Sequence, residues 1–290
     1  MSFTGVDSLL ENQSLLDLDI IPGKDLKWKS FFNIRSGDLG TFYFTDNEMD
    51  ASAYLDSPHY QLCIPLNTHG QDYLVNGVAT SQMFLMTPTN TLCAVFPRKF
   101  NELHFIFRAD IFAEMAKTNE AYELLPKNKV FFYDQCDVAV WSEMLFSALN
   151  DASLNVDQVL RKFMDYFFEI HSLSNGLMSS NLKKSFFIKQ LIPYLKENIY
   201  KDLAVTDMCQ QFDVSRRSFE SYFKKYFGNS PASHFKKMKL MRVRQEILSA
   251  KNGDLSNILS KFQNLHVAHF GQFYKRYFGE TMTQTRSRKT

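Results

Sequence analysis

The chain has 290 residues, of which 45% are hydrophobic and 15% aromatic, so its length and apolar content allow two domains with buried cores. Its 33 Lys and Arg nearly balance its 31 Asp and Glu, but residues 1–180 hold 12 basic and 23 acidic side chains, whereas residues 181–290 hold 21 and 8. No run of apolar residues approaches the eighteen or so of a membrane-spanning helix, and the N-terminal residues lack the pattern of a signal peptide. The four cysteines are widely separated, which excludes a disulfide scaffold or a zinc ribbon.

Short strand-like segments follow one another between Leu39 and Phe107. They are rich in Phe, Tyr, Val and Ile and are separated by turn signals such as Asn76-Gly77, a dipeptide typical of a tight hairpin. The expected strands are Thr41–Thr45, Tyr60–Leu66, Asp72–Val75, Met83–Met86, Leu92–Phe96 and Leu103–Phe107. This spacing favours a small sandwich or barrel, and we take a cupin-like β-barrel as the expected architecture.

The pattern changes to helical periodicity beyond this region. Helices are predicted over Ile111–Lys117, Val138–Asn150 and Val156–His171, and in the last of these apolar residues recur at three- and four-residue steps. This apolar stripe includes Phe163 and Phe167 and has two interpretations. It packs against the β-domain, or it forms the subunit interface of a homodimer.

An enzymatic β-domain would need clustered metal ligands or a nucleophile motif. His59, His69 and His104 each lack a second ligand at a short, fixed spacing, so we predict no metal site and no cofactor. The sequence also lacks a nucleophile elbow, a Walker loop and a dinucleotide-binding glycine pattern. An aromatic-lined interior without these features is suited to binding a small effector, or it is simply a packed core.

Residues 172–182 are poor in charge and rich in Ser, Asn and Gly, which is the composition of a flexible connector. The sign of the charge balance also reverses across this segment. We therefore predict a regulatory β-barrel with helices at 1–171, for ligand sensing, dimerisation or both, a linker at 172–182, and a basic helical domain at 183–290. The excess of basic residues predicts that the last of these binds a polyanion.

The basic part contains an internal repeat. Phe219–Ser230 aligns with Phe270–Thr281 at an offset of 51 residues, with the shared skeleton F-x-x-[YF]-[FY]-K-[KR]-Y-F-G-x-[ST]. In each copy, aromatic residues at four-residue steps form one face of a helix, and Gly228 or Gly279 is expected to end it.

A shorter helix precedes each copy of the repeat. We expect Thr206 and Ser256 to begin these helices as N-caps, and Ser215 to cap the helix that follows Asp213. A short helix, a tight turn and a second, basic amphipathic helix describe a helix-turn-helix. One such unit is hard to distinguish from an ordinary helical hairpin, but two copies in a basic domain favour DNA binding.

The segment VSRRSFESYFKKYFGNSP, at Val214–Pro231, resembles the first helix-turn-helix of the AraC/XylS family of bacterial transcription regulators. Lys239–Leu248 resembles the linker helix of that family, and the second copy of the repeat, through Arg286, resembles its C-terminal signature. The resemblance covers about Lys184–Arg288. It implies an α+β protein in which a small regulatory barrel precedes an all-α domain of two helix-turn-helix units joined by a linker helix.

The second unit departs from the family pattern in its turn. Gly-Phe is usual there, whereas the alignment places Gln263-Asn264 at this point; if Lys261-Phe262 is the true counterpart, the turn is two residues longer. Asp213 stands in the first turn where Gly is common, and Asp tolerates a left-handed conformation. These departures put in question whether the second unit reads bases.

A recognition helix presents its N-terminal, solvent-facing side chains to base edges in the major groove, and basic residues one turn later contact phosphates. The base-reading candidates are Arg216, Arg217, Glu220, Ser221, Ala268, His269 and Gln272. The phosphate-binding candidates are Thr206, Ser215, Lys224, Lys225, Lys275 and Arg276. A basic run around the expected linker helix is either a solvated face or a further contact with the DNA backbone; its residues are Lys236, Lys237, Lys239, Arg242 and Arg244.

These observations predict a cytoplasmic, sequence-specific DNA-binding regulator that is not an enzyme. The resemblance implies that activation is its output and that promoter DNA and RNA polymerase are its partners, with a small effector in the N-terminal barrel and a homodimer as further expectations. Two alternatives remain. One is a cupin-like enzyme or sensor localised by a basic domain, and the other is a protein that coats DNA without sequence preference.

Overall fold

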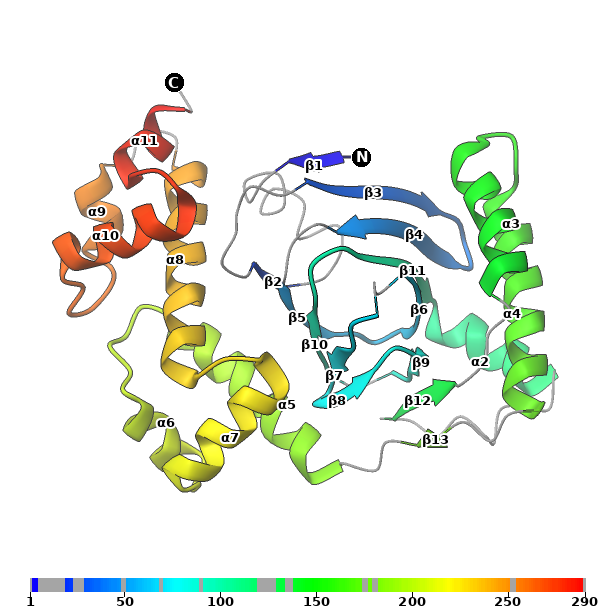
Figure 1. The fold of residues 1–290 in the computed structure, drawn as a ribbon, viewed down its shortest axis with the longest axis horizontal. Helices are drawn as coiled ribbons and strands as arrows, with labels where there is room; N and C mark the ends of the chain where they lie inside the picture. The colour runs from blue at the N-terminus through cyan, green and yellow to red at the C-terminus, as the bar shows by residue number, and fades with distance from the viewer. Residues whose placement is uncertain are drawn as a thin grey trace.

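The computed structural model describes residues 2–4, 19–22, 29–47, 51–67, 70–88, 91–118, 129–133, 138–173, 177–178, 182–250 and 254–288. Within these ranges a β-rich N-terminal part is followed by a helical C-terminal part (Figure 1), so the α+β class is confirmed. None of the described helices is both long and apolar enough to cross a membrane. Much of the predicted linker lies outside the described residues, as does His69.

The larger sheet has the strand order β1-β3-β4-β11-β6-β9-β12-β13 among the described strands. Its strands are β1 (Ser2–Thr4), β3 (Lys29–Ser36), β4 (Gly40–Asn47), β6 (Tyr60–Asn67), β9 (Met83–Met86), β11 (Phe100–Phe107), β12 (Val130–Tyr133) and β13 (Leu177–Met178). The central strand β11 pairs with β4 along its whole length, from Phe100 opposite Asn47 to Phe107 opposite Gly40. Strand β13 falls inside the predicted linker and pairs with β12.

The smaller sheet has the order β2-β5-β10-β7-β8 among the described strands. Its strands are β2 (Asp19–Pro22), β5 (Ala51–Asp56), β7 (Tyr73–Val75), β8 (Val78–Thr80) and β10 (Thr91–Phe96). Asn76 and Gly77 join β7 to β8 and both have positive φ, 49° and 75°, as a type I′ hairpin turn requires. The predicted hairpin is therefore confirmed.

The two sheets pack face to face around an apolar interior. Tyr73 and Phe96 of the smaller sheet contact Phe84 and Phe100 of the larger one, with ring centroids 4.8–6.1 Å apart. Neither strand order closes on itself within the described residues, so these strands form an open sandwich and not the closed barrel that we expected. The strand spacing also allowed a sandwich. In a sandwich the apolar side chains are buried between two facing sheets, whereas in a barrel they are buried around a central axis.

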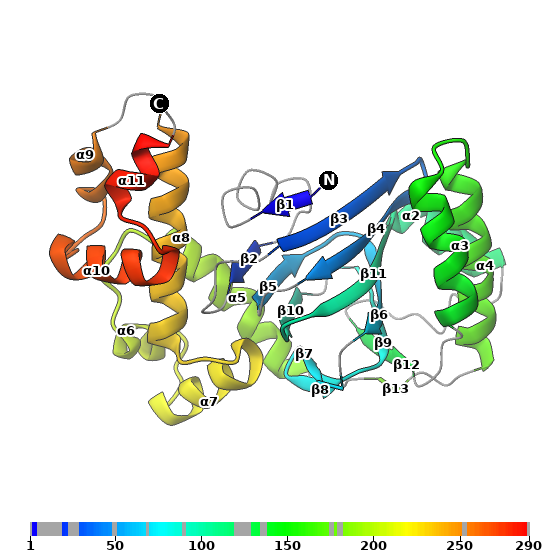
Figure 2. The same cartoon turned by 45° about the horizontal axis from the view of Figure 1, so that its top comes forward.

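Helices cover the outer face of the larger sheet. They are α2 (Ala109–Thr118), α3 (Val138–Asn150) and α4 (Val156–Leu173), and the last two lie side by side at the far end of the molecule from the C-terminal helices (Figures 1 and 2). Arg35 on β3 ties this layer to the sheet, because its guanidinium donates to the carbonyl of Ala148 at 2.8 Å.

Phe163 and Phe167, the candidate dimer contacts, lie inside this layer. Each is 1% exposed, and Phe163 stacks on Phe105 of β11 with ring centroids 4.2 Å apart. Phe167 packs against Tyr133 and Phe112. Because both rings are buried within the chain's own core, the packing interpretation is supported and the interface interpretation is corrected.

The C-terminal part is entirely helical where it is described. Its helices are α5 (Leu182–Glu197), α6 (Val205–Gln211), α7 (Arg216–Phe227), α8 (Pro231–Ser249), α9 (Leu255–Leu259), α10 (Val267–Phe278) and α11 (Met282–Ser287). Helix α8 has 19 residues, so it is about 28 Å long at 1.5 Å per residue. It joins the unit α6–α7 to the unit α9–α10 (Figure 1).

The backbone of the two units repeats at the offset found in the sequence. Asp213 and Asn264 both adopt left-handed conformations, with φ of 47° and 51°, and the helices that follow both end at a left-handed glycine, Gly228 or Gly279. Asn264 is therefore the structural counterpart of Asp213, and the turn of the second unit is not lengthened. The alignment through Gln263-Asn264 is the correct one.

Two of the three predicted N-caps are wrong. Helix α6 begins after Ala204, whose N–H donates to the Asp207 carboxylate at 2.9 Å, and helix α9 is capped by Asp254. Thr206 and Ser256 are each the second residue of their helix. Ser215 is confirmed as a cap, since its hydroxyl accepts from the N–H of Ser218 at 3.2 Å.

The C-terminal end of α7 packs against the smaller sheet of the sandwich. The Ser52 hydroxyl donates to the carbonyl of Phe227 at 3.2 Å, and Tyr54 and Cys93 share an apolar cluster with α5 and α7. Farther along the chain, Met241 of α8 belongs to the apolar cluster between the sheets. The first unit and the linker helix are thus held against the N-terminal part (Figure 2).

Candidate nucleic-acid interface

Helix α7 is anchored by one aromatic face. Phe219, Phe223 and Phe227 lie at four-residue steps and are at most 2% exposed. Their successive ring centroids are 5.1 and 4.9 Å apart. Because a helix repeats every 3.6 residues, this spacing directs the intervening residues to the opposite side. All four base-reading candidates of the first unit are exposed there: Arg216, Arg217, Glu220 and Ser221.

Two of these four side chains interact with each other. The guanidinium of Arg216 donates to the carboxylate of Glu220 at 2.9 Å, which is an i,i+4 pair on the surface. Arg217 makes no hydrogen bond or ion pair with any other described residue. Its five N–H donors are therefore available for a ligand, and an arginine in this state suits bidentate hydrogen bonding to guanine O6 and N7.

The phosphate candidates of the first unit differ in their surroundings. Thr206, Ser215 and Lys224 are exposed, although the Ser215 hydroxyl is also engaged as the cap of α7. Lys225 is exposed too, but its aliphatic stem lies over the β7–β8 turn, so close that a Cβ on Gly77 would be 2.8 Å from Lys225 Cε. Lys225 thus contacts the sandwich as well as solvent.

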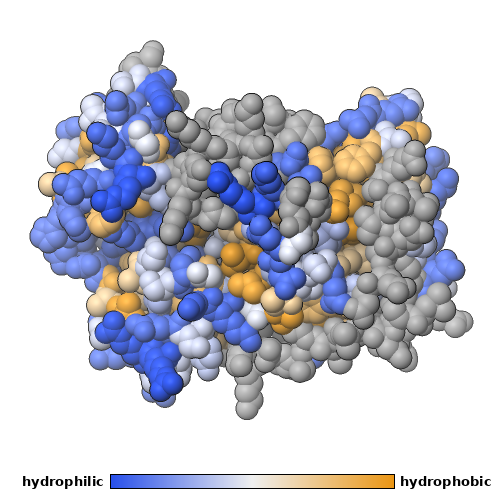
Figure 3. Space-filling model, in the orientation of Figure 1, coloured by the Kyte–Doolittle hydropathy of each residue, from blue (hydrophilic) through white to orange (hydrophobic). Residues whose placement is uncertain are grey.

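The second unit presents a different surface. Phe270 and Tyr274 bury one side of α10, while Ala268, His269 and Gln272 are exposed on the other side. The last turn carries the phosphate candidates Lys275 and Arg276, which are also exposed. The face of the molecule over the C-terminal helices is mostly hydrophilic, as the left side of Figure 3 shows.

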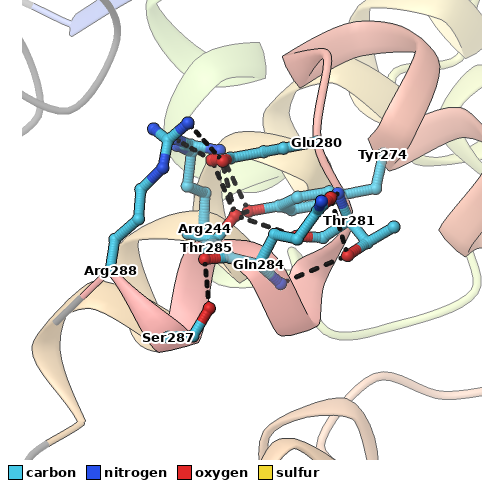
Figure 4. A network of polar contacts seen from close by, with 8 residues as sticks. All are labelled: Arg244, Tyr274, Glu280, Thr281, Gln284, Thr285, Ser287 and Arg288. Carbon is cyan, nitrogen blue, oxygen red and sulfur yellow. Dashed lines mark hydrogen bonds and ion pairs between the residues drawn. The ribbon is translucent and has the colours of Figure 1, made fainter. Parts of the chain in front are cut away.

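A buried polar network connects α8 to the second unit. Arg244 is 4% exposed and donates to the Glu280 carboxylate at 2.7 Å, to the Tyr274 hydroxyl at 3.2 Å and to the Thr285 hydroxyl at 3.3 Å (Figure 4). From the surface, Arg288 also pairs with Glu280, at 2.7 Å. Arg244 therefore holds α8, α10 and α11 together, and it is neither a solvated residue nor a contact to DNA.

Other cations of the basic run also form contacts within the protein. Arg242 pairs with Glu246 at 3.2 Å, Lys239 donates to the carbonyl of Lys201 at 2.6 Å, and the ammonium of Lys236 lies over the ring of Phe273. Burial lowers the pKa of Lys239 below its usual value. The basic run thus stabilises the linker helix, and the exposed cations of α7 and α10 remain as the groups best placed for a polyanion.

Two helix-turn-helix units in tandem, each with an exposed recognition helix and joined by one long helix, define a DNA-binding domain. Residues 208–288 match the family model of a helix-turn-helix domain. The C-terminal region of this chain is therefore similar to the helix-turn-helix domains that this family model describes.

The curated relatives match only part of this chain. The chain is 26% identical over 92 residues to the HTH-type transcriptional regulator GbdR of Pseudomonas aeruginosa, a match covering 32% of this chain and 25% of that protein. It is 23% identical over 117 residues to the XylDLEGF operon transcriptional activator of Pseudomonas putida, over 38% of this chain and 36% of that protein. The chain therefore spans about a quarter to a third of the length of these curated relatives. The crystal structure of the AraC-like transcriptional activator CuxR aligns with 90% of this chain and 99% of that one, at 10% identity and a TM-score of 0.41.

Proposed function

We propose that this chain is a sequence-specific DNA-binding transcription regulator, with activation as its output. The observation that carries the proposal is the pair of exposed recognition helices, α7 and α10, each anchored by aromatic residues and basic in its last turn. Their reading faces differ in chemistry, which favours recognition of defined bases over uniform coating of DNA. Promoter DNA is the proposed ligand and RNA polymerase the proposed protein partner.

The test is the loss of discrimination when one reading side chain is removed. Arg217→Ala should weaken binding to the specific site by about 1–3 kcal/mol, or roughly 5- to 150-fold, and should relax base preference within one half of that site. The reason is that Arg217 is exposed and has no partner among the described residues. Quantitative gel shifts on a site selected from random DNA, and on single-base variants of it, measure the effect.

Lys224→Ala is the matched control, because this exposed cation lies about two turns farther along the same helix. It should weaken binding to all sequences alike and reduce the slope of log K against log salt concentration by about one. If Arg217→Ala weakens specific and random DNA equally, the base-reading role of Arg217 is refuted.

We also propose the division into a regulatory part at 1–171, a connector at 172–182 and the DNA-binding part at 183–290, with a small effector acting between the first and the last. A cavity of about 410 Å³ supports this arrangement, since its walls come from both parts: Ala53 and Tyr54 of β5 on one side, and Met238 and Met241 of α8 on the other. Its lining is mainly apolar, and the buried Nδ1 of His234 has no hydrogen-bond partner among the described residues. A largely apolar molecule with one polar group fits this chemistry.

The effector site can be tested by filling the cavity. Met238→Trp places a larger apolar side chain in the wall, so it should abolish the stabilisation of the full chain by any small molecule that binds there. A thermal-shift screen of small amphipathic molecules against the wild type and this variant measures the effect. Leu154→Trp, at an exposed position far from the cavity, serves as the control. Ligands that stabilise the wild type and Met238→Trp equally would place the effector elsewhere.

A further inference from the structure

Three potential metal ligands meet inside the β-sandwich, outside the DNA-binding domain. Cys63 is on β6, and Glu102 and His104 are on the neighbouring strand β11, where His104 is directly opposite Cys63. Their ligand atoms all lie within 4.8 Å of one another. The exposed fractions are 0% for Cys63, 6% for Glu102 and 5% for His104.

The orientation of His104 leaves one ring nitrogen for a ligand. Its Nε2 lies 2.9 Å from the amide oxygen of Gln61, and because an amide oxygen only accepts, Nε2 carries the proton. The lone pair is then on Nδ1, which faces Glu102 Oε1 at 3.9 Å. Metal-ligating histidines are typically oriented in this way, by a hydrogen bond from the nitrogen that does not bind the metal. The ring also stacks on Tyr43, with centroids 4.9 Å apart.

The carboxyl group of Glu102 lacks a cation among the described residues. It accepts a hydrogen bond from the Cys63 thiol, with Sγ and Oε2 2.7 Å apart. Burial raises the pKa of Glu102 to about 7 and that of Cys63 well above its usual value, and it lowers the pKa of His104 to about 3. Burial is thus the main physical cause of all three shifts.

A fourth polar group next to the cluster is unsatisfied. Thr45 of β4 is directly opposite Glu102 and is 1% exposed, so its side chain points to the same face of the sheet. Its hydroxyl has no hydrogen-bond partner among the described residues. A buried hydroxyl without a hydrogen-bond partner is destabilising, and a bound water beside it would supply the missing partner.

We propose that Cys63, Glu102 and His104 bind one divalent transition-metal ion of the zinc class through Sγ, a carboxylate oxygen and Nδ1, with a water beside Thr45 as the fourth ligand. A thiolate and a carboxylate balance the two positive charges, and imidazole, thiolate and carboxylate are the donors that Zn²⁺ prefers. Binding releases the thiol proton and any carboxyl proton to solvent. In a tetrahedral site the donor atoms are about 3.3–3.7 Å apart. The present separations lie on either side of that range, at 2.7 Å from Cys63 Sγ to Glu102 Oε2 and 3.9 Å from His104 Nδ1 to the other carboxylate oxygen, Oε1.

The experiment is a metal titration of the full chain after its metals have been removed. Zn²⁺, in competition with a chromophoric chelator, should bind to the wild type with a stoichiometry of one per chain. Cys63→Ser and Glu102→Gln should each weaken this binding by at least about 100-fold, because each removes a ligand. Gln61→Met should weaken it by about 10–100-fold, since it only releases the orientation of His104.

Cys93→Ser is the matched control. Cys93 is also 0% exposed and on a strand of the sandwich, but it lies in the cluster shared with α5 and α7. This variant should bind Zn²⁺ like the wild type. Co²⁺ bound to the wild type should show a thiolate-to-metal charge-transfer band, which is a readout that does not depend on the folding of any variant.

Three results would overturn the proposal. They are wild-type binding no tighter than that of Cys63→Ser, a Co²⁺ complex without the thiolate band, and loss of Zn²⁺ binding in Cys93→Ser but not in Cys63→Ser. Each would show that the cluster is a packed polar group in the core or that the metal binds elsewhere.

Discussion

Arg244→Met is expected to lower the free energy of unfolding by about 3–5 kcal/mol. The substitution removes the buried guanidinium 2.7 Å from the Glu280 carboxylate, which is itself only 6% exposed, and leaves that carboxylate paired only with the solvent-exposed Arg288. It also removes a donor from the Tyr274 and Thr285 hydroxyls. Removing one partner of a buried ion pair is costly because the other charge remains in a poorly solvated site. Urea unfolding of the full chain, followed by far-UV circular dichroism, measures the change.

The surface arginine of the same network is the matched control. Arg288 pairs with Glu280 at the same 2.7 Å distance but its side chain is 65% exposed, so Arg288→Ala should cost less than about 1 kcal/mol. The double variant Arg244→Met/Glu280→Leu should recover much of the loss, since it removes the stranded carboxylate as well. A stability of Arg244→Met within about 1 kcal/mol of the wild type would contradict a structural role for the pair.

Phe163→Ala is expected to destabilise the N-terminal part by about 3–5 kcal/mol. The ring is 1% exposed and stacks on Phe105 at a centroid distance of 4.2 Å and an interplanar angle of 5°, so its removal leaves a cavity between α4 and the larger sheet. The cost combines the lost transfer free energy of the ring with the lost contacts of its neighbours. Chemical unfolding, together with light scattering for the oligomeric state, measures the effect.

Leu154→Ala is the control for this prediction, because Leu154 precedes the same helix but is 39% exposed. It should change the stability by no more than about 0.5 kcal/mol. A Phe163→Ala variant that is as stable as the wild type and differs only in its oligomeric state would restore the interface interpretation.

The strands that could be predicted are those with a strong local signal. Met83–Met86 was predicted with its observed bounds, and Leu103–Phe107 overlaps β11, because both are rich in apolar or aromatic residues and bounded by turns. Strands β3 and β5 have the sequences KSFFNIRS and ASAYLD. Their polar and small residues interrupt the apolar and aromatic enrichment that is typical of a strand. Their extended conformation comes from pairing with β4 and β10, which is a tertiary effect.

The residues of the candidate sites divide in the same way, into those with a local sequence signal and those whose surroundings depend on distant parts of the chain. The exposure of Arg217 and Gln272 followed from helical periodicity alone, since the aromatic stripe of each helix is local. The burial of Arg244 depends on Glu280, 36 residues away, so counting nearby charges placed it wrongly on the surface. His104 was interpreted as isolated for the same reason, because Cys63 reaches it only through the pairing of β6 with β11.

The unequal surfaces of α7 and α10 have a consequence for how the chain would lie on a promoter. A homodimeric repressor with one reading helix per subunit recognises a palindrome, which looks the same from either direction. Here one chain carries Arg217, Glu220 and Ser221 on one helix and Ala268, His269 and Gln272 on the other, and the 19-residue helix α8 connects the two units. Under the proposed base-reading role of these residues, the site that fits them is asymmetric, so reversing the sequence would place each helix over the wrong bases. A bound monomer would thus have a direction, and its β-sandwich would always lie towards the same side of the gene.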